Sequence, residues 1–415
     1  MSLCQKTRFF GRAGESLRLN LANNSVSLNP QVVRTPTVLP MRKLILSLLV
    51  FCALLVSAQA SAQVSAQVPE QQASAQQPAQ VWHDAAEMHV YGKAVEETYG
   101  HYVRFPEDIH AKARQALQNL GQDAAGLYVQ FRTDSPVVHV RWTSVKKQAM
   151  SHMTLVGSRG LDLYARVGKD WRFVGSARPE ENSHETTRVL VKGMDPVEKE
   201  FRMYLSLYDG VSALEIGVEE GASFEPINAE TRKAPVVMYG TSILQGGCVS
   251  RPGMAATNIL GRWLDREVVN LGFSGNARLD AEIAELMARV ENPAVFVLDN
   301  VPNDTPQMIL EKMEPFVKTL RDAHPAVPIV FVGQAPYAQD AVSTSSAERV
   351  RLKNEAQHTM YKRLKAAGCK KLYYVSGERL IGTDGEATVD YVHQTDLGAM
   401  RYAEALYPLL KKVCK

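Results

Sequence analysis

The sequence predicts an α/β fold preceded by an all-β domain: an antiparallel β-sandwich over residues 81–230, then a parallel sheet with helices over residues 233–415. Three observations support this prediction. The 415 residues exceed the usual length of one domain, so two folded units are expected. The first range holds short runs rich in β-branched and aromatic residues, whereas the second alternates apolar strands with helical stretches.

The sandwich prediction depends on short β-rich runs in the first range. In several of them apolar and polar residues alternate, which is typical of strands with one buried face. Turn residues such as 134–136 and 168–170 separate neighbouring runs. The predicted strands cover 127–131, 137–142, 161–165, 171–174, 187–191, 203–207 and 213–218.

In the second range, compact apolar strands are predicted at 236–239, 268–271, 295–298, 329–332 and 372–375. Helical stretches lie at 254–264, 281–290, 308–323, 347–366 and 396–410. Strand–helix alternation gives a parallel sheet that is covered on both faces. In such sheets ligands bind beyond the carboxyl ends of the strands.

The N-terminal region has the parts of a secretory signal peptide. A basic start at Met41, Arg42 and Lys43 precedes the apolar run 44–56, and a small-residue segment of the Ala-x-Ala kind follows at 57–62. We therefore expect secretion or export to a periplasm, and no membrane span once the signal is removed.

The predicted signal divides the N-terminal region into three segments. The signal peptide occupies 41–60, an extension without periodic apolar pattern precedes it at 1–40, and a Ser-Ala-Gln-rich flexible linker follows at 61–80.

Charge and cysteine content give no support for a nucleic-acid-binding, zinc-binding or disulfide-stabilised protein. A formal net charge of +3 gives no indication of nucleic acid or of an anionic membrane as a partner. After signal cleavage the cysteines are Cys248, Cys369 and Cys414, an odd number without the spacing of a zinc site or a disulfide framework. An oxidising compartment would allow Cys369 to pair with Cys414, which the sequence leaves open.

Ser242 follows the first predicted strand of the α/β part, in Gly240-Thr241-Ser242-Ile243. A serine at a strand-to-helix turn exposes its hydroxyl at the sheet edge, where backbone amides can face a developing negative charge. By itself the position equally suits a helix-capping serine or a phosphate-binding loop.

A nucleophilic serine needs a base, and His393 is the histidine best placed for this role. It lies in the loop between the fifth strand and the last helix, and Asp390 precedes it by three residues. A carboxylate there can orient the imidazole and stabilise its charged form. The alternatives are a local hydrogen bond in a surface loop, or a metal site with Asp384 or Asp396, for which a second histidine is lacking.

Two further loops carry candidate hydrogen-bond donors. Gly275 lies after the second strand and Asn303 after the third. A glycine lets a backbone amide approach an oxyanion closely, and an asparagine side chain can donate from another side. Each is also a common turn residue. Because the loops follow parallel strands, we expect them at the same sheet edge as Ser242.

These four segments together resemble the four sequence blocks of the SGNH (GDSL-like) hydrolases. The resemblance covers about 233–415 and implies a flavodoxin-like sheet with a Ser-His-Asp triad. It implies that Ser242 is the nucleophile and first oxyanion donor, that Gly275 and Asn303 are the other donors, and that His393 is the general base oriented by Asp390.

The chain departs from the family pattern at three positions. Thr241 replaces a frequent aspartate, Val301 replaces the usual glycine of the third block, and Gln394 follows the histidine where proline is frequent. A valine in place of that glycine could change the conformation of the loop that carries Asn303. The predicted sandwich is similar, more weakly, to the N-terminal domain of two-domain SGNH esterases that deacetylate carbohydrates.

The resemblance implies a serine esterase that needs no metal or organic cofactor, and the signal-peptide pattern adds the expectation that it is secreted. Its expected substrate is a short acyl ester, acetyl above all, on an acylated carbohydrate or another small molecule. One alternative is a lipid or aryl esterase with the same mechanism. Another is a non-catalytic carbohydrate-binding protein.

Overall fold

The computed structural model describes residues 79–228 and 233–414, which belong to one compact unit, Gln76–Lys415. The predicted extension (1–40), the signal peptide (41–60) and nearly all of the linker (61–80) lie outside the described residues. Within the part of the chain that is described, no helix combines the length and apolar character needed to cross a bilayer.

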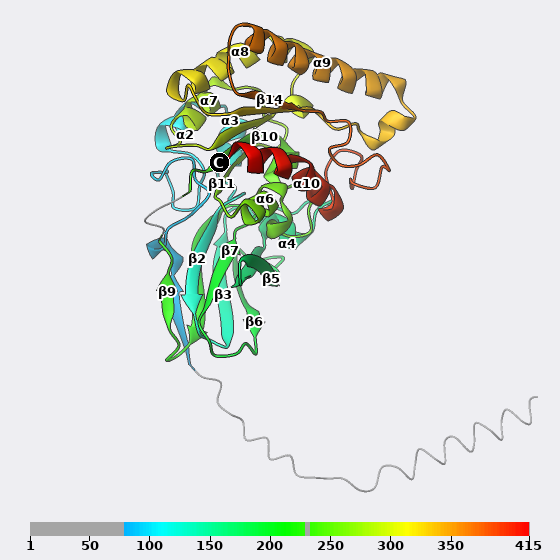
Figure 1. Ribbon diagram of the computed structural model, residues 1–415. Helices are drawn as coiled ribbons and strands as arrows, with labels where there is room; N and C mark the ends of the chain where they lie inside the picture. The colour runs from blue at the N-terminus through cyan, green and yellow to red at the C-terminus, as the bar shows by residue number, and fades with distance from the viewer. Residues whose placement is uncertain (1–78, 229–232, 415) are drawn as a thin grey trace, which may run out of the picture. The chain divides into compact units, whose positions relative to one another are not determined.

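The N-terminal part contains two antiparallel sheets, as predicted (Figure 1). One has the strand order β1-β8-β3-β6 and the other β5-β4-β7-β2-β9. The strands are β1 (Gln80–Asp84), β2 (Tyr128–Thr133), β3 (Val137–Ser144), β4 (Leu161–Val167), β5 (Asp170–Ala177), β6 (Glu185–Lys192), β7 (Lys199–Tyr204), β8 (Val211–Glu219) and β9 (Phe224–Pro226). The edge strands β1 and β9 were not predicted, and β9 is only three residues long.

Alternation of side chains builds the core of this part. Along β3 every second residue is buried, and Val138, Val140 and Trp142 face the other sheet, whose contributions include Phe131 and Phe201. This period of two is the pattern expected for a strand with one face on the core and the other outside.

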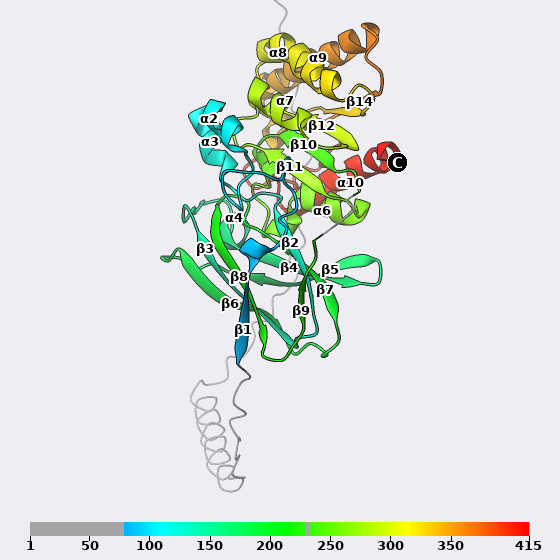
Figure 2. The same cartoon turned by 90° about the vertical axis from the view of Figure 1, so that its left-hand side faces the viewer.

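The α/β part is built on a five-stranded parallel sheet with the order β11-β10-β12-β13-β14 (Figures 1 and 2). Its strands are β10 (Val236–Gly240), β11 (Val268–Gly272), β12 (Val295–Asp299), β13 (Ile329–Val332) and β14 (Leu372–Val375). Its helices are α5 (Ser242–Gln245), α6 (Ala256–Leu264), α7 (Ala281–Ala288), α8 (Pro306–Ala323), α9 (Thr344–Ala366) and α10 (Asp396–Val413). The five strands and the five longer helices match the prediction.

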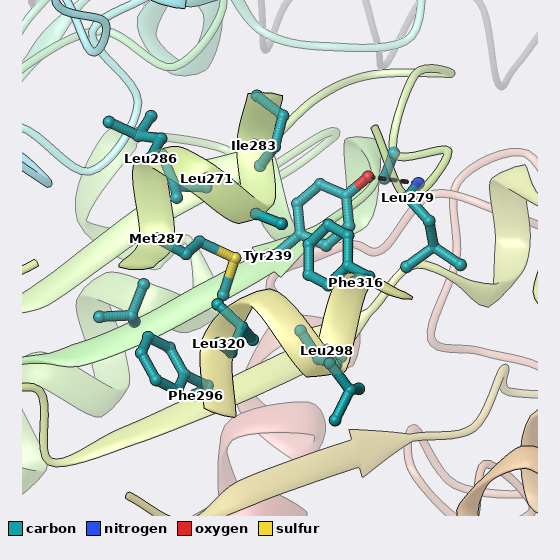
Figure 3. Close-up of a cluster of buried hydrophobic side chains, with 14 of the residues drawn as sticks. Tyr239, Leu271, Leu279, Ile283, Leu286, Met287, Phe296, Leu298, Phe316 and Leu320 are labelled. Carbon is teal, nitrogen blue, oxygen red and sulfur yellow. Dashed lines mark hydrogen bonds between the residues drawn. The ribbon is translucent and has the colours of Figure 1, made fainter. Parts of the chain in front are cut away.

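Both faces of this sheet are covered. Helices α7, α8 and α9 pack on one face, in a core that includes Val237 and Tyr239 of β10. Helices α6 and α10 pack on the other, in a core that includes Val236 and Met238. The centre of the first core is the ring of Tyr239, stacked on Phe316 at a centroid distance of 5.2 Å, and its hydroxyl accepts a hydrogen bond from the amide of Leu279 (Figure 3).

Two short helices within the range predicted as sandwich contribute to the α/β core instead. The segment that contains helices α2 (Glu107–Lys112) and α3 (Gln115–Gly121) brings Phe105, Ile109 and Leu117 into the cluster that covers the α7–α9 face. The sandwich prediction for 81–230 did not include these helices. Each is shorter than two full turns, so its apolar periodicity is weak in the sequence.

Candidate active site

Ser242 is the first residue of α5, immediately beyond the carboxyl end of β10. The side chain of Thr241 caps this helix by accepting a hydrogen bond from the amide of Ile243. As the first helical residue, Ser242 has an N–H group without an intrahelical acceptor, and the residue as a whole is 6 % exposed. The turn thus presents both a hydroxyl and a backbone donor at the sheet edge.

The histidine and the aspartate that were predicted from sequence lie beside this serine. Nε2 of His393 is 2.9 Å from Oγ of Ser242, and Nδ1 is 2.7 Å from Oδ2 of Asp390. The second carboxylate oxygen, Oδ1, accepts hydrogen bonds from the amides of Val392 and His393, at 3.1 and 2.7 Å. The loop therefore fixes the carboxylate, and the carboxylate fixes the ring.

Electrostatics at Asp390 favour its charged form. Partial burial raises the pKa of this carboxyl, but hydrogen bonds from the His393 ring and from the amides of His393 and Val392 outweigh that effect. The pKa of Asp390 is lowered as a result, so an imidazolium at His393 would face a carboxylate.

The two other predicted residues lie on neighbouring loops. Gly275 has φ +68°, in the left-handed region that favours glycine, and its amide donates to no acceptor among the described residues. Asn303 is the last residue of a short 3-10 helix, and its Oδ1 accepts a hydrogen bond from the amide of Ala277 at 3.2 Å. This bond joins the two loops and leaves Nδ2 of Asn303 as a donor.

A close backbone contact holds the second loop against α5. A Cβ atom at Gly272 would lie 2.3 Å from the amide nitrogen of Gln245, so this position requires glycine. The side chain of Gln245 continues the contact, since its Oε1 accepts from the amide of Ser274 and its Nε2 donates to Asp123. Ser242 and Gly275 are thereby connected through buried groups.

The departures from the family pattern are accommodated locally. Val301 is fully buried in the core on the α7–α9 face, and Asn303 still reaches the Ala277 amide. Gln394 is 2 % exposed, and its carbonyl accepts a hydrogen bond from the amide of Cys248 at 3.0 Å.

The N-terminal part also supplies residues to this site, which sequence reasoning missed. The ring of His152 lies 5.6 Å from that of His393, and its Nε2 is 4.0 Å from Oδ2 of Asp390. The hydroxyl of Tyr208 donates to the carbonyl of Ser242 at 3.2 Å. Neither residue lies in a motif, so no local signal in the sequence indicates its proximity.

A cleft of about 300 Å³, lined by both polar and apolar side chains, opens beside the loop that carries Gly275. The hydrogen-bonding side chains among its lining residues are those of Asn119, Asp123, Lys146, Gln148, Tyr208, Ser274 and Asn276. The cleft is therefore bounded on one side by residues of the N-terminal part and on another by the loop that carries Gly275.

The three cysteines of the described residues are free thiols, so Cys369 and Cys414 do not pair. Cys248 lies close to the triad. Burial, together with the charge of Asp390, raises the pKa of this thiol to about 12. A thiol that stays protonated is a weak nucleophile.

Asp384 and Asp396, the carboxylates that were considered as metal ligands, both interact with other side chains of the protein. Asp384 forms a bidentate ion pair with Arg401, both distances being 2.8 Å. Asp396 accepts hydrogen bonds from the amide and the hydroxyl of Ser250.

Comparisons with known proteins agree with this architecture. The model of the GDSL-like lipase/acylhydrolase family matches residues 233–411. The model of the N-terminus of SGNH-hydrolase-type esterases, named GxDLY, matches residues 80–224. A solved structure from Bacteroides ovatus, described as a GDSL-like lipase, is 34 % identical, with a TM-score of 0.77 over 81 % of this chain and 98 % of its own. The chain is an SGNH hydrolase.

Membership of this family makes the protein an ester hydrolase. The fold of this SGNH hydrolase also recurs in more distant structures. The salicylyl-acyltransferase SsfX3 of a tetracycline biosynthetic pathway is 18 % identical, with a TM-score of 0.64 over 79 % of this chain and 95 % of its own. A family two carbohydrate esterase from Cellvibrio japonicus is 13 % identical, with a TM-score of 0.53 over 81 % and 98 %. No curated protein sequence matches the chain.

The GxDLY motif of the SGNH hydrolase explains how its two parts are joined. It is Gly160-Leu161-Asp162-Leu163-Tyr164, whose last four residues begin β4. The two leucines point into the sandwich core, while Asp162 and Tyr164 point out of the opposite face. There Asp162 accepts from Arg251 at 2.8 Å and from the Gly253 amide at 2.7 Å, and Arg251 also donates to the Tyr164 hydroxyl. The motif thus positions the loop between α5 and α6.

Proposed function

We propose that this SGNH hydrolase is a secreted serine esterase that removes short acyl groups, acetyl above all, from carbohydrates. The observation that carries the proposal is the hydrogen-bonded series Ser242–His393–Asp390, with distances of 2.9 and 2.7 Å, beside unpaired amide donors. A hydroxyl, an imidazole and a carboxylate in this order are the groups that activate a serine nucleophile.

In the proposed mechanism, Oγ of Ser242 attacks the ester carbonyl while Nε2 of His393 takes its proton. The oxyanion receives hydrogen bonds from the amides of Ser242 and Gly275 and from Nδ2 of Asn303. The protonated His393 then donates to the leaving alcohol, which leaves an acyl-enzyme at Ser242. Water, activated by His393, releases the acid and restores the serine.

Two features favour a carbohydrate as the alcohol component. The cleft beside the oxyanion loop offers amide, hydroxyl and ammonium groups from Asn119, Gln148, Tyr208 and Lys146, which suit a ligand rich in hydroxyl groups. The fold is shared with a carbohydrate esterase of family two. The basic and apolar segments at 41–60 support export, which would bring the enzyme to polymers outside the cell.

The test is an activity screen over acetylated polysaccharides and over aryl and lipid esters of increasing acyl length. We expect release of acetate from an acetylated glycan, and loss of this release in the Ser242→Ala protein. Preference for long-chain lipid esters would contradict the carbohydrate assignment. Labelling with a fluorophosphonate gives an independent readout, because adduct formation at Ser242 requires an activated nucleophile but no particular alcohol.

A further inference from the structure

Two imidazoles and one thiol lie close together beside Ser242, and one of the imidazoles is that of His393. One ligand atom each from His152, Cys248 and His393 lies within 4.8 Å of the other two. These residues come from three distant segments: the loop before helix α4 (Leu155–Arg159), the loop after α5, and the loop before α10. The proposed esterase mechanism uses only one of the three.

We propose that His152, Cys248 and His393 form a zinc-binding site whose occupation blocks the triad. Two imidazoles and a thiol are ligands that Zn²⁺ accepts in tetrahedral sites, with bond lengths of about 2.0–2.3 Å. Atoms within 4.8 Å of each other need only small side-chain rotations to reach such positions. With three protein ligands, the fourth position is left for water, as in many zinc sites that bind exchangeable ligands.

The backbone around the three ligands is fixed in advance. The amide of Cys248 donates to the carbonyl of Gln394, the neighbour of His393. The hydroxyl of Thr154, two residues after His152, donates to the carbonyl of Ser250. Each ligand loop is thus tied to the next, which lowers the entropy cost of bringing the ligands together.

Occupation of this site is incompatible with the proposed triad. His393 has two ring nitrogens, and both are engaged, Nε2 with Ser242 and Nδ1 with Asp390. Zn²⁺ needs a nitrogen lone pair, so it displaces one of these partners whichever nitrogen it takes. It also displaces the proton of the Cys248 thiol. Zinc binding does not depend on the proposed esterase function, whereas inhibition does.

Access to the site is possible through its histidines. The side chain of His152 is 34 % exposed and that of His393 is 23 % exposed, whereas Cys248 is 8 % exposed. An ion can therefore meet the imidazoles first and the thiol afterwards. This arrangement suits reversible binding from solution.

Binding is tested with Co²⁺, which takes the ligands of Zn²⁺ and gives a thiolate charge-transfer band in the near ultraviolet. We expect a single equivalent of Co²⁺ to produce this band in the wild-type and Ser242→Ala proteins, and Zn²⁺ to abolish it. The band should be absent from the Cys248→Ser protein. A folded wild-type protein that shows no thiolate band would overturn the site, whatever its activity on esters.

Inhibition is tested by titrating Zn²⁺ into an ester hydrolysis assay, each variant being compared with its own uninhibited rate. We expect Cys248→Ser and His152→Gln each to raise the inhibitory zinc concentration by about 10-fold or more. Cys369→Ser and His358→Gln remove the same residue types elsewhere and should leave it unchanged. Equal zinc sensitivity in all of these proteins would overturn the proposal. If no ester is hydrolysed at all, the proposed function fails, but the cobalt result still decides the zinc site.

Discussion

The residues at the carboxyl edge of the parallel sheet have different roles in the proposed reaction. Ser242 and His393 exchange a proton, whereas Asp390 holds the ring and Asn303 acts on the oxyanion alone. Their hydrogen bonds support this division, because the His393 ring contacts both Ser242 and Asp390, while the Asn303 side chain accepts from the amide of Ala277 on the neighbouring loop. Substitutions at these positions should therefore differ in which kinetic constant they change.

Substitution of Ser242 or His393 by alanine should abolish turnover and leave the fold intact. Loss of a triad member commonly reduces the rate by about 10⁴-fold or more. Steady-state kinetics on an acetyl ester, with circular dichroism to verify folding, measure the effect. Substantial activity in a folded Ser242→Ala protein would contradict the mechanism.

Asn303→Ala should lower kcat by about 10²–10³-fold with little change in KM, because an oxyanion donor acts mainly in the transition state. The control is Asn182→Ala, which removes an exposed amide side chain from the loop between β5 and β6. If Asn303→Ala instead raised KM at constant kcat, the side chain would be a substrate contact.

Sequence reasoning could identify the residues of one sheet edge, and only those. Parallel strands place their following loops together, so the positions of Ser242, Gly275, Asn303 and His393 could be inferred from strand order. The proximity of His152 could not be inferred, because it results from packing between two parts of the chain that share no motif at that point.

Among the elements, the strands and longer helices were predictable and the short ones were not. Strands of the parallel sheet are continuous apolar runs, and α8 and α9 are long enough for their pattern to repeat. β9, with three residues, and α2 and α3, with six and seven, owe their existence to tertiary packing. For helices, length separated success from failure. For strands it did not, since β13 and β14, with four residues each, were predicted, whereas the five-residue edge strand β1 was not.

The end of β12 carries a buried carboxyl, Asp299, whose burial raises its pKa to about 7 although Tyr402 donates a hydrogen bond to it. In the unfolded chain its pKa would be about 4. The folded state therefore holds the proton more tightly, so this group's contribution to stability is full below about pH 4 and is lost as the pH rises through about 7.

Asp299→Asn should remove this dependence, because an amide still accepts from Tyr402 and does not ionise. Between pH 5 and pH 8 we expect the wild type to lose on the order of 2–4 kcal/mol of unfolding free energy relative to the variant. Urea denaturation of both proteins at pH 5 and at pH 8 measures this difference in unfolding free energy. Asp322→Asn, at an exposed position of α8, is the control, and an identical pH dependence in Asp299→Asn and wild type would refute the assignment.

At the scale of the whole molecule, the ion pair between Asp162 and Arg251 links the sandwich to the α/β part. The aspartate side chain is 0 % exposed and that of the arginine 21 %. Asp162→Ala leaves the partly buried guanidinium without a carboxylate partner and should cost about 3–5 kcal/mol of unfolding free energy. Arg178→Ala, which breaks an exposed pair with Glu181, should cost no more than about 1 kcal/mol. Equal costs in denaturant titrations would show that the buried pair is not a structural link.

Export is a second property of the whole chain. If 41–60 is a signal peptide, the mature protein begins near Ser61 and is found outside the cytoplasm. N-terminal sequencing of the native protein, with fractionation of the producing cells, tests this. An unprocessed N-terminus at Met1 in the cytosol would contradict it, and the Ser242 mechanism would be unaffected.

Helices α2 and α3 limit the modularity of this protein. They precede most of the sandwich in sequence, yet Phe105, Ile109 and Leu117 complete the core of the α/β part. Recombination at a boundary near residue 230 would separate a hydrolase from side chains that fill its own interior, and would leave an apolar patch open to aggregation. Shuffling of sandwich domains between relatives should therefore fail unless residues 92–121 stay with the hydrolase. A workable crossover consequently has to keep residues 92–121 together with residues 233–415, although most of the sandwich lies between them in the sequence.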